Sequence, residues 1–281
     1  MSISRLRTHV KITWCPGCGN FAIMNAFIRA ILELEFKIKD IVVITGIGCH
    51  GRLHEYLRLN SFHTIHGRVL PLAIGIKLAN KDLLVIGFSG DGDAYAIGIN
   101  HFIHAARRNV DIKYIVHNNM VFGLTRGQVS PTSPLGLKTK STPEGNFVRP
   151  INPIALALIA GATFVARGFT GDIEHLTTVL KQALLHRGFA FIDILQPCVT
   201  FYNTLPMLRR KVYKLEESGH DISNFDEAMD RALESDKIPI GVFYKVRRPT
   251  FEEQIPQLKG KPMSFRDIEM ERVLKFVGKL V

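Results

Sequence analysis

The sequence predicts an open α/β fold, in which a mostly parallel sheet has helices on both faces. Four short apolar runs, rich in β-branched residues, lie within residues 40–51, 82–93, 111–119 and 189–198, and each ends in a cluster of Gly, Asn or Pro. Runs that are apolar throughout are typical of parallel strands covered on both faces. The helix-like segments between them predict right-handed crossover connections.

Two other segments shape the expected organisation. Residues 120–145 are rich in Gly, Pro, Ser and Thr without periodicity, and a loop of this length in a compact domain is usually functional or mobile. From about residue 203 the pattern changes to a charged amphipathic helix at residues 223–234 and Pro-punctuated extended pieces. We expect a main domain at residues 1–203 and a C-terminal extension at residues 204–281 that packs on a partner subunit.

Composition is that of an ordinary globular protein, with 281 residues, 46% hydrophobic and 22% charged. The first residues lack the apolar stretch of a secretory signal, and the longest apolar run, from Pro153, is too short to span a bilayer. We therefore expect a soluble, cytoplasmic protein without a membrane partner. In a reducing compartment four cysteines are not expected to form two structural disulfides, which favours metal or cluster ligation.

The positive charge is unevenly distributed. Of the formal net charge of +11, residues 1–206 carry +9. No stripe of aromatic residues interleaved with Lys and Arg is present, so a nucleic-acid partner is not expected. An acidic protein or a phosphorylated cofactor fits the excess, as does a merely solvated basic face.

The unusual residues follow the predicted strands. Cys49, residues 90–93, residues 118–119 and Cys198 each come just after one of the four apolar runs. In open parallel sheets the carboxyl ends of the strands share one edge, where ligands bind. These residues are therefore expected to meet at one rim of the sheet.

A Gly-Asp-Gly stretch at residues 90–92 predicts a site for a diphosphate and its metal ion. Glycines on either side of Asp91 let backbone N–H groups approach a diphosphate, while the carboxylate binds the divalent cation that neutralises it. The next strand delivers Asn119, 28 positions later, whose amide oxygen suits the same ion. Gly-Asp-Gly by itself is often only a turn, so the prediction depends on this combination.

The pair Cys15 and Cys18 is ambiguous on its own. Two thiols three positions apart can bind zinc, ligate an iron–sulfur cluster, exchange a disulfide or lie idle in a turn. A zinc-stabilised basic binding module without catalysis, with Gly-Asp-Gly as a turn, is therefore an alternative hypothesis for the whole chain.

Taken together, the motifs resemble those of thiamine diphosphate enzymes, whose signature is Gly-Asp-Gly followed some thirty residues later by Asn-Asn. The neighbouring motifs narrow the resemblance to the β subunit of 2-oxoacid:ferredoxin oxidoreductases. They are WCPGCGN, GIGCHGR, FHTIHGRVLPLAIGIKLAN, GDGDAYAIG, HNNMVFGLTRGQVSPTS and ILQPC. The resemblance extends from about residue 14 to residue 203 and more weakly beyond.

The resemblance implies that Cys15, Cys18, Cys49 and Cys198 are the ligands of one [4Fe-4S] cluster. Gaps of 31 and 149 positions between the later cysteines would be unusual for a zinc ribbon, whose second pair is close-set. On a shared sheet rim such gaps are reasonable.

The family resemblance also implies that thiamine diphosphate is bound through Mg²⁺. The expected Mg²⁺ ligands are the side chains of Asp91 and Asn119 and the backbone carbonyl of Val121. The residues expected around the diphosphate and the thiazolium are Gly90, Gly92, Asp93, Gly123 and Leu124. Those expected to line the cofactor on its cluster side are Ile47, Gly48, Cys49 and His50, with His66 near the cofactor.

Two positions are predicted to serve catalysis. Arg52 is placed near the substrate carboxylate, because a guanidinium binds carboxylates bidentately; its other interpretation is an exposed loop arginine. Leu124 is expected beside the thiazolium. Relatives commonly have a small serine where this chain has His50, so the hydrogen bonding after Cys49 is expected to differ here.

The implied function is the oxidative decarboxylation of a 2-oxoacid, of the 2-oxoglutarate or pyruvate class, with coenzyme A to an acyl-CoA. Electrons would pass through the cluster to ferredoxin. In this family the glutamate that activates the aminopyrimidine belongs to an α subunit, so an αβ or α2β2 assembly is expected to be the active form. The sequence does not choose among 2-oxoacids.

Overall fold

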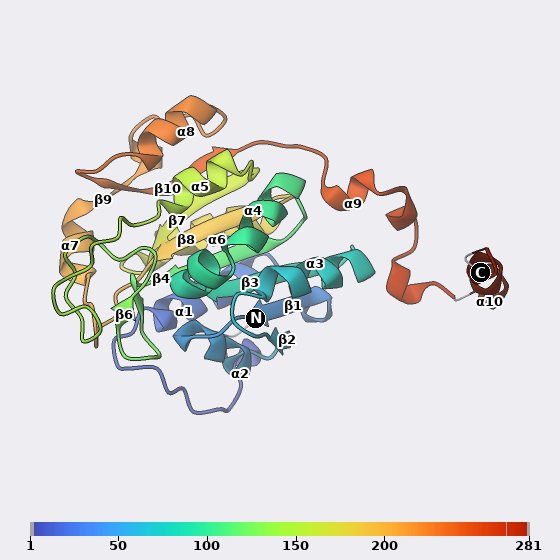
Figure 1. The fold of residues 1–281 in the computed structure, drawn as a ribbon, viewed down its shortest axis with the longest axis horizontal. Helices are drawn as coiled ribbons and strands as arrows, with labels where there is room; N and C mark the ends of the chain where they lie inside the picture. The colour runs from blue at the N-terminus through green and yellow to red at the C-terminus, as the bar shows by residue number, and fades with distance from the viewer. Residues whose placement is uncertain (1–2, 268, 280–281) are drawn as a thin grey trace.

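An eight-stranded sheet with helices on both faces forms the body of the protein in this computed structural model, which describes residues 3–267 and 269–279 (Figure 1). The strand order is β2-β1-β3-β4-β8-β7-β10-β9. The strands are β1 (Ile41–Thr45), β2 (Asn60–His63), β3 (Leu84–Gly90), β4 (Lys113–Asn118), β7 (Phe164–Phe169), β8 (Ala190–Leu195), β9 (Val212–Lys214) and β10 (Ile238–Lys245). Every pairing is parallel except that between β10 and β7. The predicted fold class is confirmed.

Two helical layers cover the sheet. One face packs against α1 (Asn20–Glu33) and α6 (Ile173–Leu185), and the other against α3 (Val69–Ala79), α4 (Ile99–Arg108) and α5 (Pro153–Ile159). Strands β4, β7 and β8 are buried along their whole length, as the uninterrupted apolar runs predict. Within the described residues, no helix has the length and apolarity that crossing a membrane requires.

The segment after residue 203 continues the same sheet. It contains α7 (Leu205–Lys211), β9, α8 (Phe225–Ala232) and β10, and α8 packs against the core on the α5 side. Because β10 pairs with β7, the predicted boundary between the main domain and the C-terminal extension, at residue 203, separates strands that belong to one sheet.

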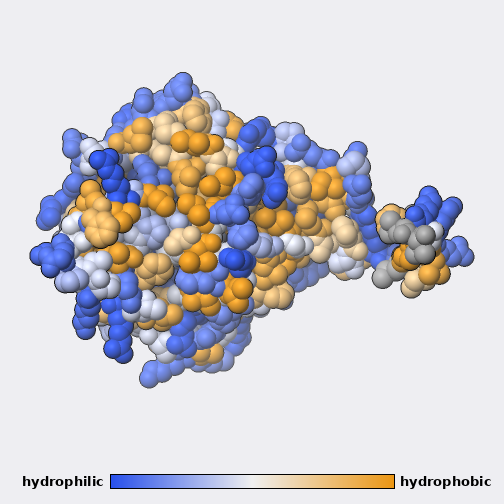
Figure 2. All heavy atoms as spheres, viewed as in Figure 1, coloured by the Kyte–Doolittle hydropathy of each residue, from blue (hydrophilic) through white to orange (hydrophobic). Residues whose placement is uncertain are grey.

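Beyond β10 the chain forms an arm that leads away from the body. It contains the short α9 (Phe251–Gln254) and ends in α10 (Met270–Val277), which projects from the rest of the molecule (Figure 1). Apolar residues on the viewed face continue along the arm towards α10 (Figure 2). On α10 the exposed apolar side chains are Met270, Val273, Leu274, Phe276 and Val277. Packing of this arm on a partner subunit stays a prediction.

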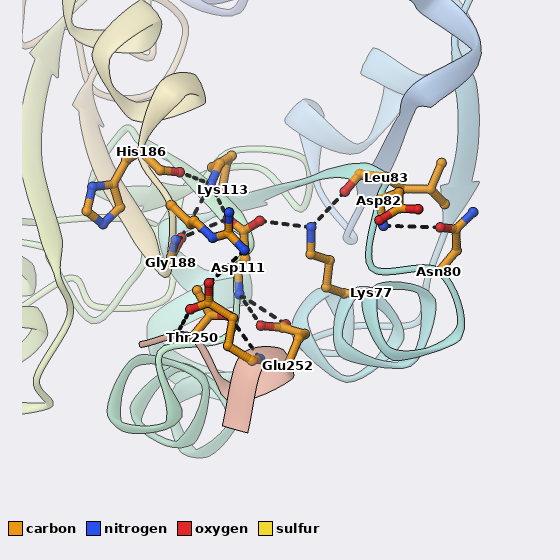
Figure 3. Close-up of polar contacts among 12 residues, drawn as sticks. Lys77, Asn80, Asp82, Leu83, Asp111, Lys113, His186, Gly188, Thr250 and Glu252 are labelled. Carbon is orange, nitrogen blue, oxygen red and sulfur yellow. Dashed lines mark hydrogen bonds and ion pairs between the residues drawn. The ribbon is translucent and has the colours of Figure 1, made fainter. Parts of the chain in front are cut away.

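A buried ionic cluster joins the arm to the N-terminal edge of the sheet (Figure 3). The carboxylate of Asp111 lies 2.8 Å from Lys77 Nζ and 2.5 Å from Lys113 Nζ. Both lysines are buried, and each also donates to a backbone carbonyl, Lys77 to that of Leu83 and Lys113 to that of His186. The Asp111 N–H donates to the carboxylate of Glu252 in α9, 3.1 Å away. The arm is thereby bound to the body through Asp111.

Replacing Asp111 by asparagine is expected to destabilise the protein strongly. The substitution leaves the ammonium groups of Lys77 and Lys113 buried without their carboxylate partner, and breaking a buried ion pair costs about 3–5 kcal/mol. Urea denaturation at pH 7 would measure the loss. The matched control is Asp236→Asn, at an exposed position, which should change the free energy of unfolding by less than about 0.5 kcal/mol.

In the wild type, acid should remove the stabilisation that the ionised Asp111 carboxylate provides. Burial raises the pKa of Asp111, but the two lysines outweigh burial and hold that pKa well below its usual range. The contribution is therefore complete above the unfolded-state pKa of about 3.9 and is lost as the pH falls through the lower folded-state pKa. The stability difference between wild type and Asp111→Asn should shrink below about pH 4; a constant difference down to pH 2 would contradict this account.

Candidate functional site

A cavity of about 110 Å³, here called the rim cavity, lies where the loops after β1, β3 and β4 meet. The structure brings into its lining every residue predicted to contact thiamine diphosphate or Mg²⁺: Ile47, Gly48, Cys49, His50, His66, Gly90, Asp91, Gly92, Asp93, Asn119, Val121, Gly123 and Leu124. Sequence reasoning missed four further lining residues, His117, Phe122, Thr125 and Gln196. The predicted meeting point at the carboxyl ends of the strands therefore exists.

Asp91 is held by hydroxyl groups of the long loop. Its Oδ2 accepts hydrogen bonds from Ser130 Oγ at 2.5 Å and Thr132 Oγ1 at 2.7 Å. The side chain is buried, and burial raises the pKa of Asp91 to about 6. The loop thus orients the carboxylate that lines the rim cavity. The cluster of Ser and Thr in the loop was the available sequence signal for these two residues.

The segment after β4 turns sharply at Met120, whose φ of 61° is left-handed. Asn119 Oδ1 accepts a hydrogen bond from the N–H of Val121 at 3.1 Å. An amide oxygen has two lone pairs, so this bond leaves one for a cation. The turn places Asn119, Val121 and Asp91 around one cavity.

Asp93 orients the loop that carries His66. Its Oδ1 accepts from the Gly67 N–H at 2.7 Å and lies 2.6 Å from His66 Nδ1, and its Oδ2 accepts from Ser89 Oγ at 2.7 Å. These donors use both oxygens of a buried carboxylate. Asp93 therefore lines the rim cavity, while its hydrogen bonds are made to the protein.

Two buried histidines form the inner wall of the rim cavity. His50 and His117 are 4% and 1% exposed, with ring centroids 5.7 Å apart. Burial lowers the pKa of each to about 3, so both are neutral at physiological pH. His117 Nδ1 pairs with Asn20 Oδ1 at 2.8 Å, whereas the Nε2 atoms of both histidines lack a hydrogen-bond partner among the described residues. Unpaired buried polar atoms of this kind fit a cavity that receives a polar ligand.

The four cysteines line a second cavity of about 290 Å³, here called the thiol cavity. Cys15 is exposed and the other three are partly buried. Burial, with a smaller contribution from the neighbouring thiols, raises the pKa of Cys18 and Cys49 to about 11. Within the described part of the chain, no group of three or more His, Cys, Asp or Glu side chains is arranged to hold a metal ion.

The two cavities adjoin. Cys49, Asn119, Gly123 and Leu124 line both of them. A β-carbon built on Gly123 would lie 3.6 Å from Cys49 Sγ and 3.7 Å from Cys198 Sγ, so the backbone there runs directly beside two thiols. Trp14 Nε1 donates to the carbonyl of Cys49 at 2.7 Å and fixes that loop.

The two residues predicted to serve catalysis occupy different settings. Arg52 lines the thiol cavity and not the rim cavity, and its Nη2 donates to Glu55 at 3.0 Å. Its side chain is 44% exposed. Leu124 is 56% exposed and lines both cavities. A role of Arg52 towards a substrate carboxylate would require it to exchange Glu55 for the substrate.

Two family models match consecutive parts of the chain. Residues 46–194 match the thiamine pyrophosphate enzyme C-terminal TPP-binding domain, and residues 198–260 match the C-terminal part of the pyruvate ferredoxin oxidoreductase β subunit. A 2-oxoacid:ferredoxin oxidoreductase β subunit of Saccharolobus solfataricus is 46% identical over 95% of this chain and 92% of its own. The chain belongs to this family of β subunits. The β subunit implies an α-subunit partner, and the resemblance inferred from the motifs is confirmed.

Other proteins similar to this β subunit belong to the same class of enzyme. The 2-oxoglutarate synthase subunit KorB of Methanocaldococcus jannaschii is 40% identical over 88% of this chain and 93% of its own. The fold matches a solved 2-oxoglutarate:ferredoxin oxidoreductase of Magnetococcus marinus with a TM-score of 0.92 and 35% identity, over 98% of this chain and 96% of that one. The β subunit is thus part of a 2-oxoacid:ferredoxin oxidoreductase, and the alternative of a zinc-stabilised binding module is not supported.

Replacing Gly46 by alanine is expected to disturb the Asp93 hydrogen bonds. The new β-carbon would lie 1.9 Å from Asp93 Oδ2, so the carboxylate would have to leave its place. Overpacking and the loss of a buried acceptor should together lower the free energy of unfolding by at least about 2 kcal/mol, measured by chemical denaturation. In the control Gly75→Ala, no atom lies within 4 Å of the new β-carbon. That helical substitution should leave stability unchanged or raise it by about 0.5–1 kcal/mol.

Proposed function

We propose that this β subunit binds thiamine diphosphate and Mg²⁺ in the rim cavity and one [4Fe-4S] cluster in the thiol cavity. With its α subunit it would oxidise a 2-oxoacid, with coenzyme A, to an acyl-CoA and CO₂, and pass the electrons to ferredoxin. The observation that carries the proposal is the adjacency of the two cavities, which share Cys49. The set of free thiols fits a reducing compartment such as the cytoplasm.

The rim cavity fits a diphosphate-bound Mg²⁺. Asp91 and Asn119 offer oxygen ligands, which Mg²⁺ prefers, and the Val121 carbonyl is a third candidate. Gly92 is needed because a β-carbon there would lie 2.1 Å from the Phe122 ring. When bound, thiamine diphosphate supplies the nucleophilic carbon and the electron sink of the reaction. The protein orients the cofactor and, through buried neutral His50 and His117, keeps the inner wall uncharged.

The thiol cavity fits a cluster better than a single zinc ion. A tetrahedral zinc site brings its sulfurs within about 2.3 Å of one ion, and this chain shows no such set among its described residues. Four thiols that surround a cavity of about 290 Å³ suit a larger metal centre. Cys49 separates this centre from the rim cavity, so electrons have a short path between them.

The α subunit is expected to complete the cofactor site. Among the residues that the structure describes, no glutamate lines the rim cavity. This supports the expectation that the carboxylate that activates the aminopyrimidine comes from the α subunit. Apolar surface for this contact is offered by the exposed Leu124, which lines both cavities, and by the exposed Phe147 and Val148, which follow the long loop. The arm with α10 is a further candidate contact with the partner.

For the substrate we propose a 2-oxoacid of the 2-oxoglutarate or pyruvate class, with 2-oxoglutarate to be tested first. The relative from Methanocaldococcus jannaschii is named a 2-oxoglutarate synthase subunit, and the Magnetococcus marinus structure is described with 2-oxoglutarate, coenzyme A and succinyl-CoA bound. Arg52 in the thiol cavity is the candidate for the substrate carboxylate.

Co-expression with the α subunit tests the proposed function. The purified complex should show a broad visible absorbance that dithionite bleaches, and it should reduce ferredoxin with 2-oxoglutarate or pyruvate only when coenzyme A is present. The β subunit alone should be inactive. A colourless complex, or one that reduces ferredoxin with neither 2-oxoacid, would contradict the proposal.

The variant Asp91→Asn is expected to lose thiamine diphosphate binding. Removing the charged ligand from a diphosphate-bound cation should weaken the Mg²⁺-dependent affinity at least about 100-fold, measured by calorimetry on the complex. The visible spectrum and the iron content should stay unchanged, because the thiol cavity does not include Asp91. Asp82→Asn, at the exposed start of the segment that leads into β3, is the matched control and should bind normally.

Basic residues near Cys15 are expected to guide ferredoxin. Arg5 and Lys11 are exposed, whereas Arg7 donates to Asn25, so only the first two are free to face a partner without breaking a contact. Reversing both charges should lower the second-order rate of ferredoxin reduction and weaken its dependence on salt.

Two controls accompany the charge reversal. Reduction of a small neutral acceptor should be almost unchanged in the Arg5→Glu, Lys11→Glu variant, because steering acts on charged partners. Reversal of Lys37 and Lys39, exposed residues just before β1 and away from the carboxyl ends of the strands, should leave the ferredoxin rate unchanged. Identical stopped-flow rates for wild type and the first variant across a salt series would remove the steering hypothesis.

A further inference from the structure

A third cavity, of about 360 Å³, lies on the same rim of the sheet and is separate from the two already described. We call it the arginine pocket. The lining residues that matter here are Asn118, Thr132, Arg167, Asp193, Glu234 and Lys237. They come from β4, the long loop, β7, β8 and the segment that leads into β10.

Arg167 is the unusual residue of this pocket. It lies within β7, a strand that is buried along its whole length, and it is only 9% exposed. Its Nη1 donates to the Pro239 carbonyl at 3.2 Å, and its guanidinium lies 5.3 Å from the ring centroid of Phe243. Its Nε is buried and has no hydrogen-bond partner among the residues the structure describes. Burial lowers the pKa of Arg167, which indicates how poorly its charge is compensated.

The nearest carboxylate does not satisfy this guanidinium. Asp193, directly opposite Arg167 on β8, has its Oδ2 4.0 Å from Arg167 Nε, beyond hydrogen-bond distance. Asp193 instead accepts from Tyr95 at 2.7 Å and from Asn118 Nδ2 at 3.1 Å. Among the described residues, the five N–H donors of Arg167 make one hydrogen bond, that of Nη1 to the Pro239 carbonyl, and Arg167 lines the pocket.

Besides Arg167 and Asp193, one acidic and one basic side chain line the pocket, and the acidic one is already paired. Glu234 is already bound by Arg231 at 2.8 Å and by the hydroxyl of Tyr213. Lys237 is exposed, with its ammonium 6.0 Å from the ring centroid of Tyr213. A group that enters the pocket therefore meets Arg167 at its base and Lys237 at its edge, with one acidic side chain already neutralised.

We propose that the arginine pocket is a binding site for a small organic carboxylate, held by Arg167 and Lys237 and distinct from the catalytic site. A carboxylate presents two oxygens to the free side of a guanidinium, a geometry that arginine binds bidentately. A dicarboxylate suits the site better than a phosphate, because its first carboxylate can bind Arg167 while its second has the ammonium of Lys237 as a partner.

Hydrogen bonds connect the arginine pocket to Asp91, the proposed Mg²⁺ ligand in the rim cavity. Thr132 and Asn118 line the arginine pocket, and Thr132 Oγ1 lies 2.7 Å from Asp91 Oδ2 and 3.0 Å from Asn118 Oδ1. Asn118 in turn donates to Asp193. A bound carboxylate would thus contact the groups that position Asp91, which gives the enzyme a route for regulation by carboxylic acids.

Calorimetric titration of the assembled αβ enzyme with malonate tests the proposal. The wild type should bind malonate saturably, and inorganic phosphate should bind more weakly. Arg167→Lys keeps the charge but loses the planar fork, so its affinity should fall about tenfold. Lys237→Ala, at an exposed position, should weaken binding about two- to fivefold. The control Arg209→Gln removes an exposed arginine of α7 and should bind as the wild type does.

If Arg167→Lys fails to assemble, a crystal structure of the wild-type enzyme grown in malonate tests carboxylate binding directly. The proposal expects a carboxylate within hydrogen-bond distance of the Arg167 guanidinium. Ordered water alone at Arg167, or equal malonate affinity in wild type and Arg167→Lys, would overturn it. Tighter binding of phosphate than of malonate would overturn the assignment to carboxylates.

Discussion

The parallel alignment of β1, β3, β4 and β8 is the constraint on which the rest of this structure depends. Parallel strands end at one edge, so the loops that follow them must share the same small volume. Cys49 follows β1, Asp91 follows β3, Asn119 follows β4 and Cys198 follows β8. Residues separated by up to 149 positions in sequence thereby line two adjoining cavities. A slip of one strand in the sheet would separate the thiols from the proposed Mg²⁺ ligands.

Buried polar contacts then determine how the site residues point. Both carboxylates of the Gly-Asp-Gly-Asp stretch are buried, and a buried carboxylate without donors is costly. Asp91 receives its donors from the long loop, so that loop helps to form the proposed Mg²⁺ site. Asp93 receives its donors from β3 and from the loop at residues 66–67, so it positions His66. Two acidic residues separated by a single glycine therefore have different roles, because different donors surround them.

The electrostatics of the thiol cavity connect the loading of a metal centre to proton release. With pKa values of about 11, Cys18 and Cys49 are protonated at neutral pH in the absence of metal. Thiolate, and not thiol, binds metal, so a cluster must displace these protons when it binds. The same partial burial that raises these pKa values also limits the access of water and oxidants to three of the four sulfurs. Without a metal centre, both effects keep Cys18 and Cys49 protonated and poorly reactive.

The sequence by itself determined the fold class and the positions of the central strands, because these follow from local apolar patterns. Its short motifs, through the family that they resemble, also gave most of the residues that line the rim cavity, but not His117, Phe122, Thr125 and Gln196. Only the tertiary structure decided which donors hold Asp91 and Asp93, that Arg52 is paired with Glu55, and that β10 enters the sheet antiparallel beside β7. The periodicity of the sequence also did not predict that Arg167 is buried in a central strand or that Nε2 of His117 is unpaired. The physical reason is that hydrogen-bond partners and burial depend on segments far apart in the chain, whose packing no local pattern specifies.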